Sequence, residues 1–487
     1  MRSWLAMMML PALACQDDIV SEIPSPQTEA PTFEERCGVA GPVELLALAP
    51  REHAFRLDWS PDDQRMLVGV FRAAGALGLF ADTSNRAIVS VGPCGEDPMI
   101  IGEGMEVVRE YQGVALACAV DGSALFRIDP SGAADPVRIL DGTCAVRRTD
   151  AGLVAVLPSE DNLGRLVIVR EPHVLAPAVE TLVEGVGVPV NVFFGAGDYR
   201  TTPLWAKGRE AIAMKPDGDV ISVNLDDGSS TVVVGGALEF RASSDGTKIV
   251  WQTDEAPQGD PDAPISAIFL HDRESSTGVR LLDSHLAWTV SPFRRDWVVV
   301  RDNSLLGQRA FAASGEELRL PEGTAIRAVL ANDLFWLVRK ADQRTEELLW
   351  DLEGVPRVII DHAQGAPSKS GDGISVFVDA EHPAELEGAL WYGPFDGGPV
   401  RLLSERVNYQ HAIVSDGRIL GIVEKNNNAH GRLLLENPAD HSLIELDRYG
   451  YLHSPSLNAG DPFDGDIVYS VDDPEGTRHA LYRAAVR

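Results

Sequence analysis

Short runs of alternating apolar and polar residues recur along almost the whole chain. The pattern is clearest from Leu57 to Val70, where a polar turn at Ser60–Asp63 precedes the apolar run Met66–Val70. Ser, Pro, Asp and Gly favour tight turns, and alternation favours a half-buried β-strand. Variants of the turn return at Ser243–Gly246, Ser370–Gly373 and Ser415–Gly417. The pattern predicts repeated turn–strand units, and no long helical pattern follows residue 14.

The units recur at a period of roughly 40 to 50 residues, which is typical of a β-propeller built from four-stranded blades. In the first unit we expect strands at Phe55–Trp59, Met66–Phe71, Leu77–Ala81 and Ala87–Val91. About ten such units fit into residues 41–487. This exceeds the usual four to eight blades or so. Eight is the alternative count, if two units merge or are insertions.

The last unit has only three strands before the chain ends, and a spare strand, Val43–Ala49, precedes the first unit. Pairing this strand with the last unit would remove both open sheet edges, which otherwise expose unpaired backbone groups. We therefore expect an all-β fold. It consists of a single β-propeller of about ten four-stranded units, closed by residues 43–49.

The turn at Trp59-Ser60-Pro61-Asp62-Asp63, followed by an apolar strand, resembles the repeat of the periplasmic protein TolB and of prolyl-oligopeptidase-type propellers. That repeat reads roughly Trp-Ser-Pro-Asp-Gly-Lys. Here Asp63 replaces the Gly, and the fifth unit has Ser243-Ser244 in place of Ser-Pro. About five of the ten units show the resemblance. It implies a WD40-like propeller fold and no particular activity, because propellers carry many unrelated functions.

The N-terminus has the pattern of an exported protein. Arg2 precedes an apolar run from Trp4 to Ala14, which is too short to span a bilayer. Residues 12–15, Ala-Leu-Ala-Cys, resemble a bacterial lipobox, which implies a signal peptide over 1–14 and lipid attachment to Cys15. An ordinary signal peptide cut near Ala14 is the alternative. Gln16, rather than an Asp, follows Cys15, which in Gram-negative lipoproteins implies the outer membrane, so we expect an exported outer-membrane lipoprotein on the periplasmic or cell-surface side.

Residues 15–40 are rich in Pro, Ser, Thr and Glu, so we expect a flexible tether between the lipidated Cys and a propeller over 41–487. The other four cysteines are Cys37, Cys94, Cys118 and Cys144. In an exported protein an even set suggests two disulfides. Sequence does not choose among the three pairings, and our working pairing is Cys37 with Cys94 and Cys118 with Cys144.

The chain carries 42 Lys and Arg against 73 Asp and Glu, a net charge of −31, spread without a long acidic block. Such a surface repels phosphate backbones and anionic headgroups. We therefore expect no nucleic acid partner, and membrane attachment through the lipid alone. The expected partner is an envelope protein or another macromolecule, bound by a monomer.

No catalytic motif is present: the chain lacks a Gly-x-Ser-x-Gly elbow, a phosphate-binding glycine loop and a His-Glu-x-x-His sequence. Two Tyr-x-His pairs, Tyr409 with His411 and Tyr451 with His453, lie at like positions in adjacent units. They could bind a ligand at the mouth of the channel. The alternative is that the rings pack between blades.

Asp461, Asp464 and Asp466 form the best candidate for a calcium site, because oxygen-rich loops can hold calcium. Asp residues also stabilise turns through their own backbone, which is the alternative. Apart from calcium we expect no cofactor. The sequence thus favours a non-catalytic lipoprotein propeller that binds an envelope partner, and the alternative is a small-ligand binder or a hydrolase- or lyase-type enzyme with a channel-mouth site.

Overall fold

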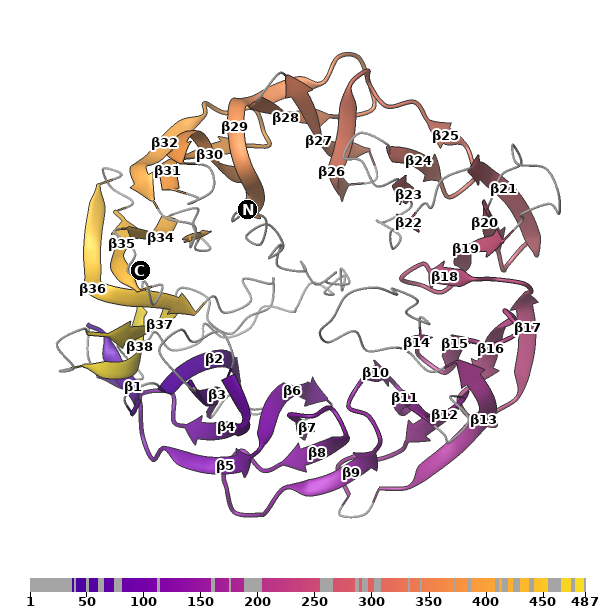
Figure 1. Ribbon diagram of the computed structural model, residues 1–487, viewed down its shortest axis with the longest axis horizontal. Helices are drawn as coiled ribbons and strands as arrows, with labels where there is room; N and C mark the ends of the chain where they lie inside the picture. Colours follow the sequence, from indigo (N-terminus) through magenta and orange to yellow (C-terminus); the bar gives the residue numbers. More distant parts are fainter. Residues whose placement is uncertain are drawn as a thin grey trace, which may run out of the picture.

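A computed structural model of the chain describes residues 37–485 with several gaps. The gaps are 39–40, 50–51, 60–64, 74–80, 112–113, 159–162, 175–176, 188–203, 255–265, 285–288, 291–296, 302–307, 332, 342–343, 371–372, 383–386, 408–410, 414–418, 424–429, 438–441, 454–465 and 474–477. In the part described, the structure is all-β, and its antiparallel sheets follow one another around a ring (Figure 1). No helix within these described ranges is long and apolar enough to cross a membrane.

Six sheets have four strands each and follow the chain in order. They are β2 (Glu52–Trp59), β3 (Met66–Ala73), β4 (Ala81–Val91) and β5 (Met99–Glu103); β6 (Met105–Tyr111), β7 (Val114–Ala119), β8 (Ala124–Ile128) and β9 (Val137–Asp141); β10 (Val146–Thr149), β11 (Gly152–Pro158), β12 (Leu163–Val169) and β13 (Val179–Gly187); β14 (Trp205–Lys207), β15 (Glu210–Met214), β16 (Val220–Asn224) and β17 (Ser230–Val234); β18 (Glu239–Ala242), β19 (Lys248–Asp254), β20 (Ser266–Asp272) and β21 (Thr277–Ser284); and β22 (Thr289–Val290), β23 (Trp297–Arg301), β24 (Gln308–Ala312) and β25 (Glu317–Leu318).

The other two sheets have seven strands each. One contains β26 (Thr324–Ala331), β27 (Leu334–Ala341), β28 (Arg344–Trp350), β29 (Arg357–Ser370), β30 (Gly373–His382), β31 (Glu387–Pro394) and β32 (Arg401–Val407); the other contains β33 (His411–Ile413), β34 (Ile419–Val423), β35 (Gly431–Glu436), β36 (Leu443–His453), β37 (Asp466–Asp472), β38 (His479–Ala485) and β1 (Val43–Ala47). In each sheet one long strand, β29 or β36, pairs with the preceding strand through its first half and with the following strand through its second half.

The expected multiple four-stranded antiparallel sheets are confirmed, and they are consistent with a β-propeller. The expected strands of the first unit were partly wrong. Its third strand is the single long β4, Ala81–Val91, and its fourth is β5, Met99–Glu103, which was not among the expected strands. Residues 77–80 of the expected strand Leu77–Ala81 lie outside the described residues.

The core lies between neighbouring sheets, and strand alternation builds it. In β11 the side chains of Leu153, Ala155 and Leu157 pack toward the sheet β6–β9. Val154 and Val156 point the other way and pack toward the sheet β14–β17. Central strands such as β11 are therefore buried on both faces and read as continuous apolar runs, which differs from the alternating, half-buried strands expected from the sequence.

A recurring polar contact, which we call the carbonyl clamp, joins successive groups of four strands, where each seven-stranded sheet counts as two groups that share β29 or β36. The donor is a side chain near the end of the third strand of one group, or at the start of its fourth strand. The acceptor is a backbone carbonyl of the next group, in the turn between its third and fourth strands. The clamps are Ser90 Oγ to Pro130 O, Arg127 to Val174 O (2.9 Å), Arg170 to Leu225 O (2.6 Å), Arg357 to Phe395 O (2.7 Å) and Arg483 to Pro93 O (2.8 Å).

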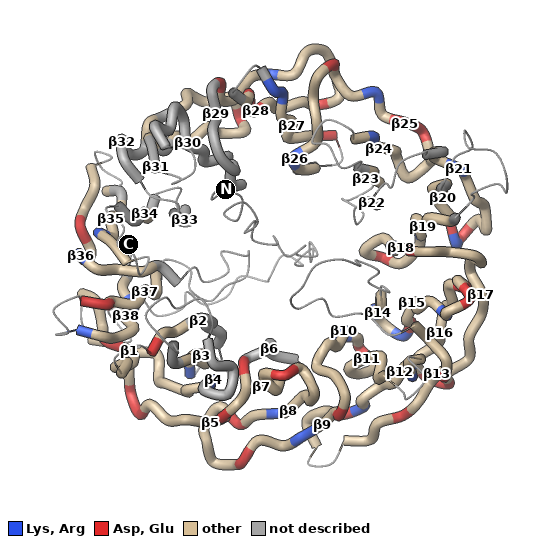
Figure 2. The backbone as a smooth tube through the Cα atoms, viewed as in Figure 1, with Lys and Arg blue, Asp and Glu red and all other residues tan. Residues whose placement is uncertain are grey.

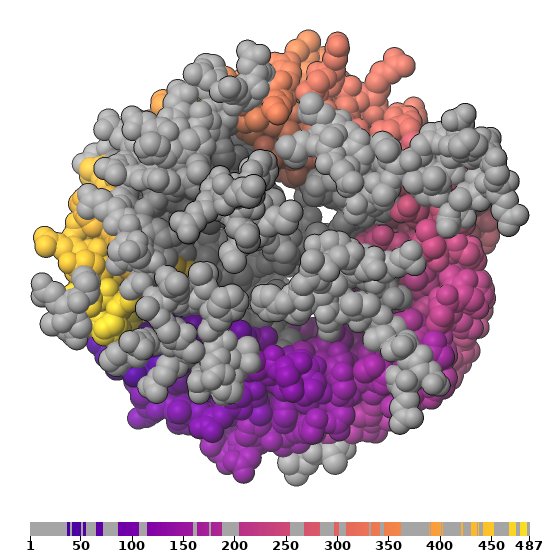
Figure 3. Space-filling model, viewed as in Figure 1, coloured from indigo at the N-terminus to yellow at the C-terminus, as the bar shows by residue number. Residues whose placement is uncertain are grey.

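The first and last parts of the chain meet at a seam. Strand β1 pairs antiparallel with β38 through four residue pairs, from Val43 with Arg483 to Ala47 with Ala480. The Leu48 amide also donates to the His479 carbonyl at 2.8 Å, although the strand itself ends at Ala47, two residues before the expected end. Figure 3 shows the indigo N-terminal part directly beside the yellow C-terminal part.

The seam has its own core and a covalent link. Leu45 is 1% exposed, and it packs in one cluster with Leu481 of the last sheet and Met66 of the first. Two disulfides are present, Cys37–Cys94 and Cys118–Cys144, and this is the working pairing. Cys94 lies in the turn at 92–98, between β4 and β5, so the segment that leads into β1 is fixed to the first sheet.

The turn at 92–98 packs so closely on β1 that a side chain at Gly95 would collide with it. Gly95 has φ +90°, and an added Cβ would lie 2.2 Å from the Glu44 carbonyl oxygen. Gly104 also has a positive φ, +64°, but nothing lies within 4 Å of its added Cβ. The two glycines share the backbone requirement, and only Gly95 has the close contact.

We therefore expect Gly95→Ala to lower the free energy of unfolding by about 1 to 3 kcal/mol more than Gly104→Ala. Both variants carry the cost of an alanine at positive φ, so the difference isolates the contact with β1. Urea unfolding followed by tryptophan fluorescence measures it. Equal losses in the two variants would contradict the packing of this turn on β1.

Candidate functional site

The turns on one face of the ring differ in length from sheet to sheet. In an antiparallel meander, the first-to-second and third-to-fourth strand turns lie on the same face, which we call the clamp face. The third-to-fourth strand turns run over 129–136 and 170–178 in two adjacent sheets, but only over 225–229 and 273–276 in the next two. Because turns can vary without disturbing the strands, such long turns are where a binding site is expected.

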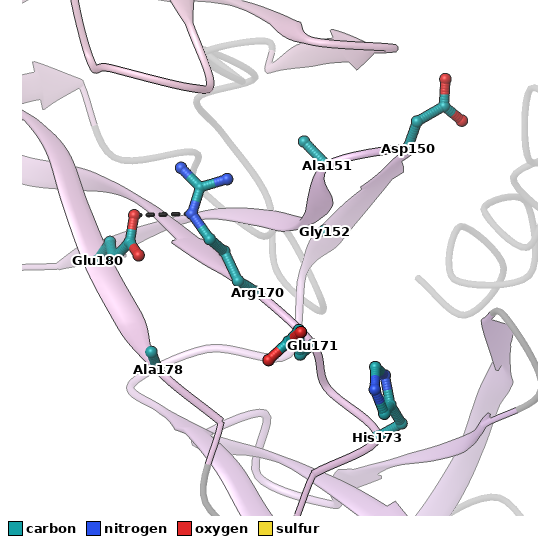
Figure 4. A pocket seen from close by; sticks show the side chains of 8 residues that line it. All are labelled: Asp150, Ala151, Gly152, Arg170, Glu171, His173, Ala178 and Glu180. Carbon is teal, nitrogen blue, oxygen red and sulfur yellow. Dashed lines mark hydrogen bonds and ion pairs between the residues drawn. The ribbon is translucent and has the colours of Figure 1, made fainter.

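A cavity of about 350 Å³ lies at the clamp face of the sheet β10–β13. The turn between β10 and β11 forms one side, and the turn at 170–178 forms the other (Figure 4). Figure 4 shows Arg170 joined to Glu180, with Nε to Oε2 at 2.8 Å, while Glu171 and His173 follow along the loop. The lining residues are Asp150, Ala151, Gly152, Arg170, Glu171, His173, Ala178 and Glu180.

A second cavity of about 390 Å³ lies beside the first, at the clamp face of the sheet β6–β9. It is bounded by the start of β7, the end of β8 and the turn at 129–136. The exposed side chain of His173 reaches it from the next sheet, so His173 lines both cavities. The lining residues are Val114, Ala115, Arg127, Ile128, Asp129, Pro130, Ala134, Asp135, Val137 and His173.

The loop that carries His173 is held from two directions. The Arg127 guanidinium donates to the carbonyl oxygens of His173 and Val174, the carbonyl clamp of this pair of sheets. Glu171 has a φ of 49°, in the left-handed region, and Pro172 is buried. The fixed backbone turns Glu171 and His173 outward, so their side chains are available to a partner while their backbone is already ordered.

Acidic groups outnumber basic groups around the two cavities. Both arginines are already engaged, Arg127 by the two carbonyls and Arg170 by Glu180 and the Leu225 carbonyl. Hydrogen bonds from Ser131, opposed in part by burial, hold the pKa of Asp129 below its usual value, so its carboxylate is charged at neutral pH. The carboxylates are Asp129, Asp135, Asp150, Glu171 and Glu180, and the arginines are Arg127 and Arg170.

This arrangement suits recognition of cationic groups. The carboxylates that the arginines leave unpaired can accept charge-assisted hydrogen bonds from an ammonium or a guanidinium. In the part of the chain that the structure describes, no group of three or more His, Cys, Asp or Glu side chains is placed to hold a metal ion.

The sequence-predicted ligand residues fall elsewhere, and the structure describes them in part. His411 begins β33 and His453 ends β36, while Tyr409 lies outside the described residues. Tyr451 is half-buried, and its ring packs beside His430, with 5.5 Å between the ring centres. His430 is only 4% exposed and was not singled out from the sequence.

Of the calcium candidates, Asp466 is the first residue of β37, and Asp461 and Asp464 lie outside the described residues. Cys15 also lies outside them. The two cavities do not coincide with any site expected from the sequence. The signal that could have indicated them is the length of the polar segments 129–136 and 170–178, which exceeds that of the turns in the next units.

No protein-family model and no curated protein matches this chain. Among solved structures the chain has distant similarity to β-propeller proteins. It is 13% identical to an oligogalacturonate lyase from Vibrio parahaemolyticus, with 79% of this chain and 97% of that chain covered and a TM-score of 0.32. It is 12% identical to TolB from Acinetobacter baumannii, with 61% and 80% covered and a TM-score of 0.24. The tricorn protease is 11% identical, with 90% and 48% covered and a TM-score of 0.25. These similarities indicate no activity for this chain.

The hydrogen bonding of Asp129 by Ser131 makes a contribution to stability that depends on pH. Because Ser131 lowers the pKa of Asp129 from 3.8, this hydrogen bonding stabilises the fold above about pH 3.8, and the stabilisation is lost as the pH falls through the lower pKa of the folded protein. We expect Ser131→Ala to raise the pKa of Asp129, measured by NMR titration of the carboxyl carbon. Ser123→Ala is the matched control, since Ser123 hydrogen bonds with Asp121 in the same way. A titration of Asp129 that is the same in all three proteins would contradict this assignment.

Proposed function

We propose that this chain is a non-catalytic, lipid-anchored propeller of the cell envelope, and that it binds a protein partner through the two acidic cavities of the clamp face. The observation that carries the proposal is the pair of adjoining cavities, which share His173 and are lined by five carboxylates against two engaged arginines. Both cavities are open to solvent, so side chains of a partner can enter them. Side chains of an extended basic segment fit two adjacent acidic cavities better than one compact ligand does.

The proposed ring has ten blades. Six sheets supply one blade each, and each seven-stranded sheet supplies two blades that share β29 or β36, so that six plus four gives ten. In this numbering, blade 1 is β2–β5 and blade 10 is β36, β37, β38 and β1. The pairing of β1 with β38 supports closure by the N-terminal strand. The clamp from Arg483 to Pro93 supports it too, because it repeats between blades 10 and 1 the contact found between internal neighbours.

The proposed location rests on the signal pattern before Cys15 and on the two disulfides, which favour an oxidising compartment. Because the surface of this protein is negatively charged, it attracts a partner that carries positively charged groups. Figure 2 shows Asp and Glu positions distributed around the described part of the ring, so the overall field steers a basic partner toward the protein, and the cavities select the place where it binds.

A second candidate function is the binding of a small cationic ligand in the same cavities. Their volumes of about 350 and 390 Å³ favour it, because one small molecule would fill either of them. The two functions differ in what they need. A peptide must reach both cavities at once, whereas a small ligand needs only one of them.

Binding of labelled trilysine tests the proposed function. We expect trilysine to bind, triglutamate not to bind, and the variant Asp150→Asn/Glu171→Gln to bind trilysine about tenfold more weakly. Fluorescence anisotropy at low and high salt measures this. The matched control is Glu316→Gln/Glu322→Gln, which removes the same charge from exposed positions far along the chain. Equal weakening by both variants would refute the site, and agmatine binding as tightly as trilysine would favour the small-ligand function.

Lipid attachment is tested on its own. When cells that express the full chain are grown with labelled palmitate, we expect label in the wild type and none in Cys15→Ala. Detergent extraction should then recover the wild type from membranes and leave the variant soluble after export. Equal labelling of the two proteins would end the proposal of a lipid anchor at Cys15.

A further inference from the structure

We propose that the outer edge of β38 is a strand-exchange site controlled by the Cys37–Cys94 disulfide. With the disulfide formed, the edge holds the chain's own β1. With the disulfide reduced, the edge accepts β1 from a second copy of this chain. The inference rests on the ring closure proposed above, and it adds a partner and a control to that closure.

The seam is asymmetric in a way that makes this exchange feasible. Strand β1 belongs by its hydrogen bonds to the last sheet, through four residue pairs with β38. Both of its flanks are anchored in the first sheet. Cys37 is bonded to Cys94 in the turn at 92–98, and β2 begins at Glu52, where the Glu52 carboxylate accepts a hydrogen bond from the Ala49 amide at 2.8 Å.

The segment that contains β1 is therefore attached to the first sheet at both ends, while β1 itself pairs with the edge of the last sheet. While both ends of the segment are fixed, a detached β1 remains next to β38 at a high effective concentration and pairs with it again. If the disulfide is broken, one end is free, and the segment becomes a flexible arm. The strand that leaves then competes with the same strand from other copies.

The uncovered edge would have a strong preference for one occupant. It presents the unpaired backbone groups of β38, which template strand addition, and an apolar gap where Leu45 is otherwise 1% exposed. Arg483, which pairs with Val43, is fully buried and donates to the Pro93 carbonyl, so the rim of the gap is already ordered. The segment that fits this edge by register and by side chain is β1 itself, and an identical β1 is available on any second copy.

The control step is thiol–disulfide exchange with a dithiol reductant. A thiolate of the reductant attacks one sulfur of the Cys37–Cys94 bond, the S–S bond breaks, and a mixed disulfide forms. The second thiol of the reductant then displaces the protein sulfur. The reductant leaves as a disulfide after giving up two electrons, and Cys37 and Cys94 each end as a thiol after taking up one proton.

The test uses the full chain with a protease recognition sequence inserted between Ala49 and Glu52, in a Cys118→Ser/Cys144→Ser background so that reduction acts on one disulfide alone. The protein is folded, cut, and then analysed by mass spectrometry after gel filtration. We expect the fragment that contains β1 to stay with the oxidised protein and to leave after treatment with dithiothreitol. Retention of the fragment after full reduction would overturn the inference.

The freed edge is then probed with a fluorescein-labelled peptide of residues 41–49. We expect this peptide to bind at least about tenfold more tightly than the same peptide with Leu45→Asp. In uncut protein, Cys37→Ser/Cys94→Ser should form dimers with rising concentration in light scattering, while Cys118→Ser/Cys144→Ser stays monomeric. Equal binding of the two peptides, or a first variant that stays monomeric throughout, would contradict strand exchange.

Amide hydrogen exchange separates failure of this inference from failure of the closure. If β1 is paired in the oxidised uncut protein, the amides of residues 43–47 are protected. Protection without release on reduction would refute only the control by the disulfide. A lack of protection would refute the closure itself, and the inference with it.

Discussion

The constraint on which this structure depends is that both apolar faces of each sheet must be covered. Each sheet is a meander whose central strands are buried on both faces, so a sheet can be stable only when another lies on either side of it. An open array would leave one apolar face uncovered at each end. Strand β1 pairs with β38, and its Leu45 packs in one cluster with Met66 and Leu481, so one short strand contacts both the first and the last sheet. The proposed ring thus depends on a small number of residues at the seam.

Apolar packing alone does not fix the position of one sheet on the next, since it is non-directional. The carbonyl clamps supply the direction. Each joins a side chain in one group to a backbone carbonyl in the turn of the next, as Arg170 does with Leu225. The same contact at the seam, from Arg483 to Pro93, is made by a side chain that is fully buried. A guanidinium is suited to this position because its planar donors can reach a backbone group while its stem packs against apolar neighbours.

The fold class could be predicted from the sequence because its signals are local. Alternation and turn residues such as Ser243–Gly246 depend on neighbours in the chain. The strand Met99–Glu103 was missed, since it is a short apolar run that follows directly on the polar turn at 92–98. The cavities could not be predicted either. They arise because Arg127 of one sheet holds the loop of the next, and the pairing of these segments is set by the packing of whole sheets. His430 beside Tyr451 has the same origin: the two residues come close only when β36 is paired with β35.

The seam and the cavities are parts of one continuous run of turns. Arg483 holds the turn at 92–98, Ser90 at the end of β4 holds the turn at 129–136, and Arg127 at the end of β8 holds the turn at 170–178. These three turns are longer than the other turns between third and fourth strands, and they follow one another from the seam to His173. The strands beneath them are of ordinary length, so the added residues build the covalent link to Cys37 in the first turn and the walls of the two cavities in the others. The part of the chain that departs most from the repeat therefore begins at the pairing of β1 with β38, and the proposed partner would bind on the two sheets that follow the first.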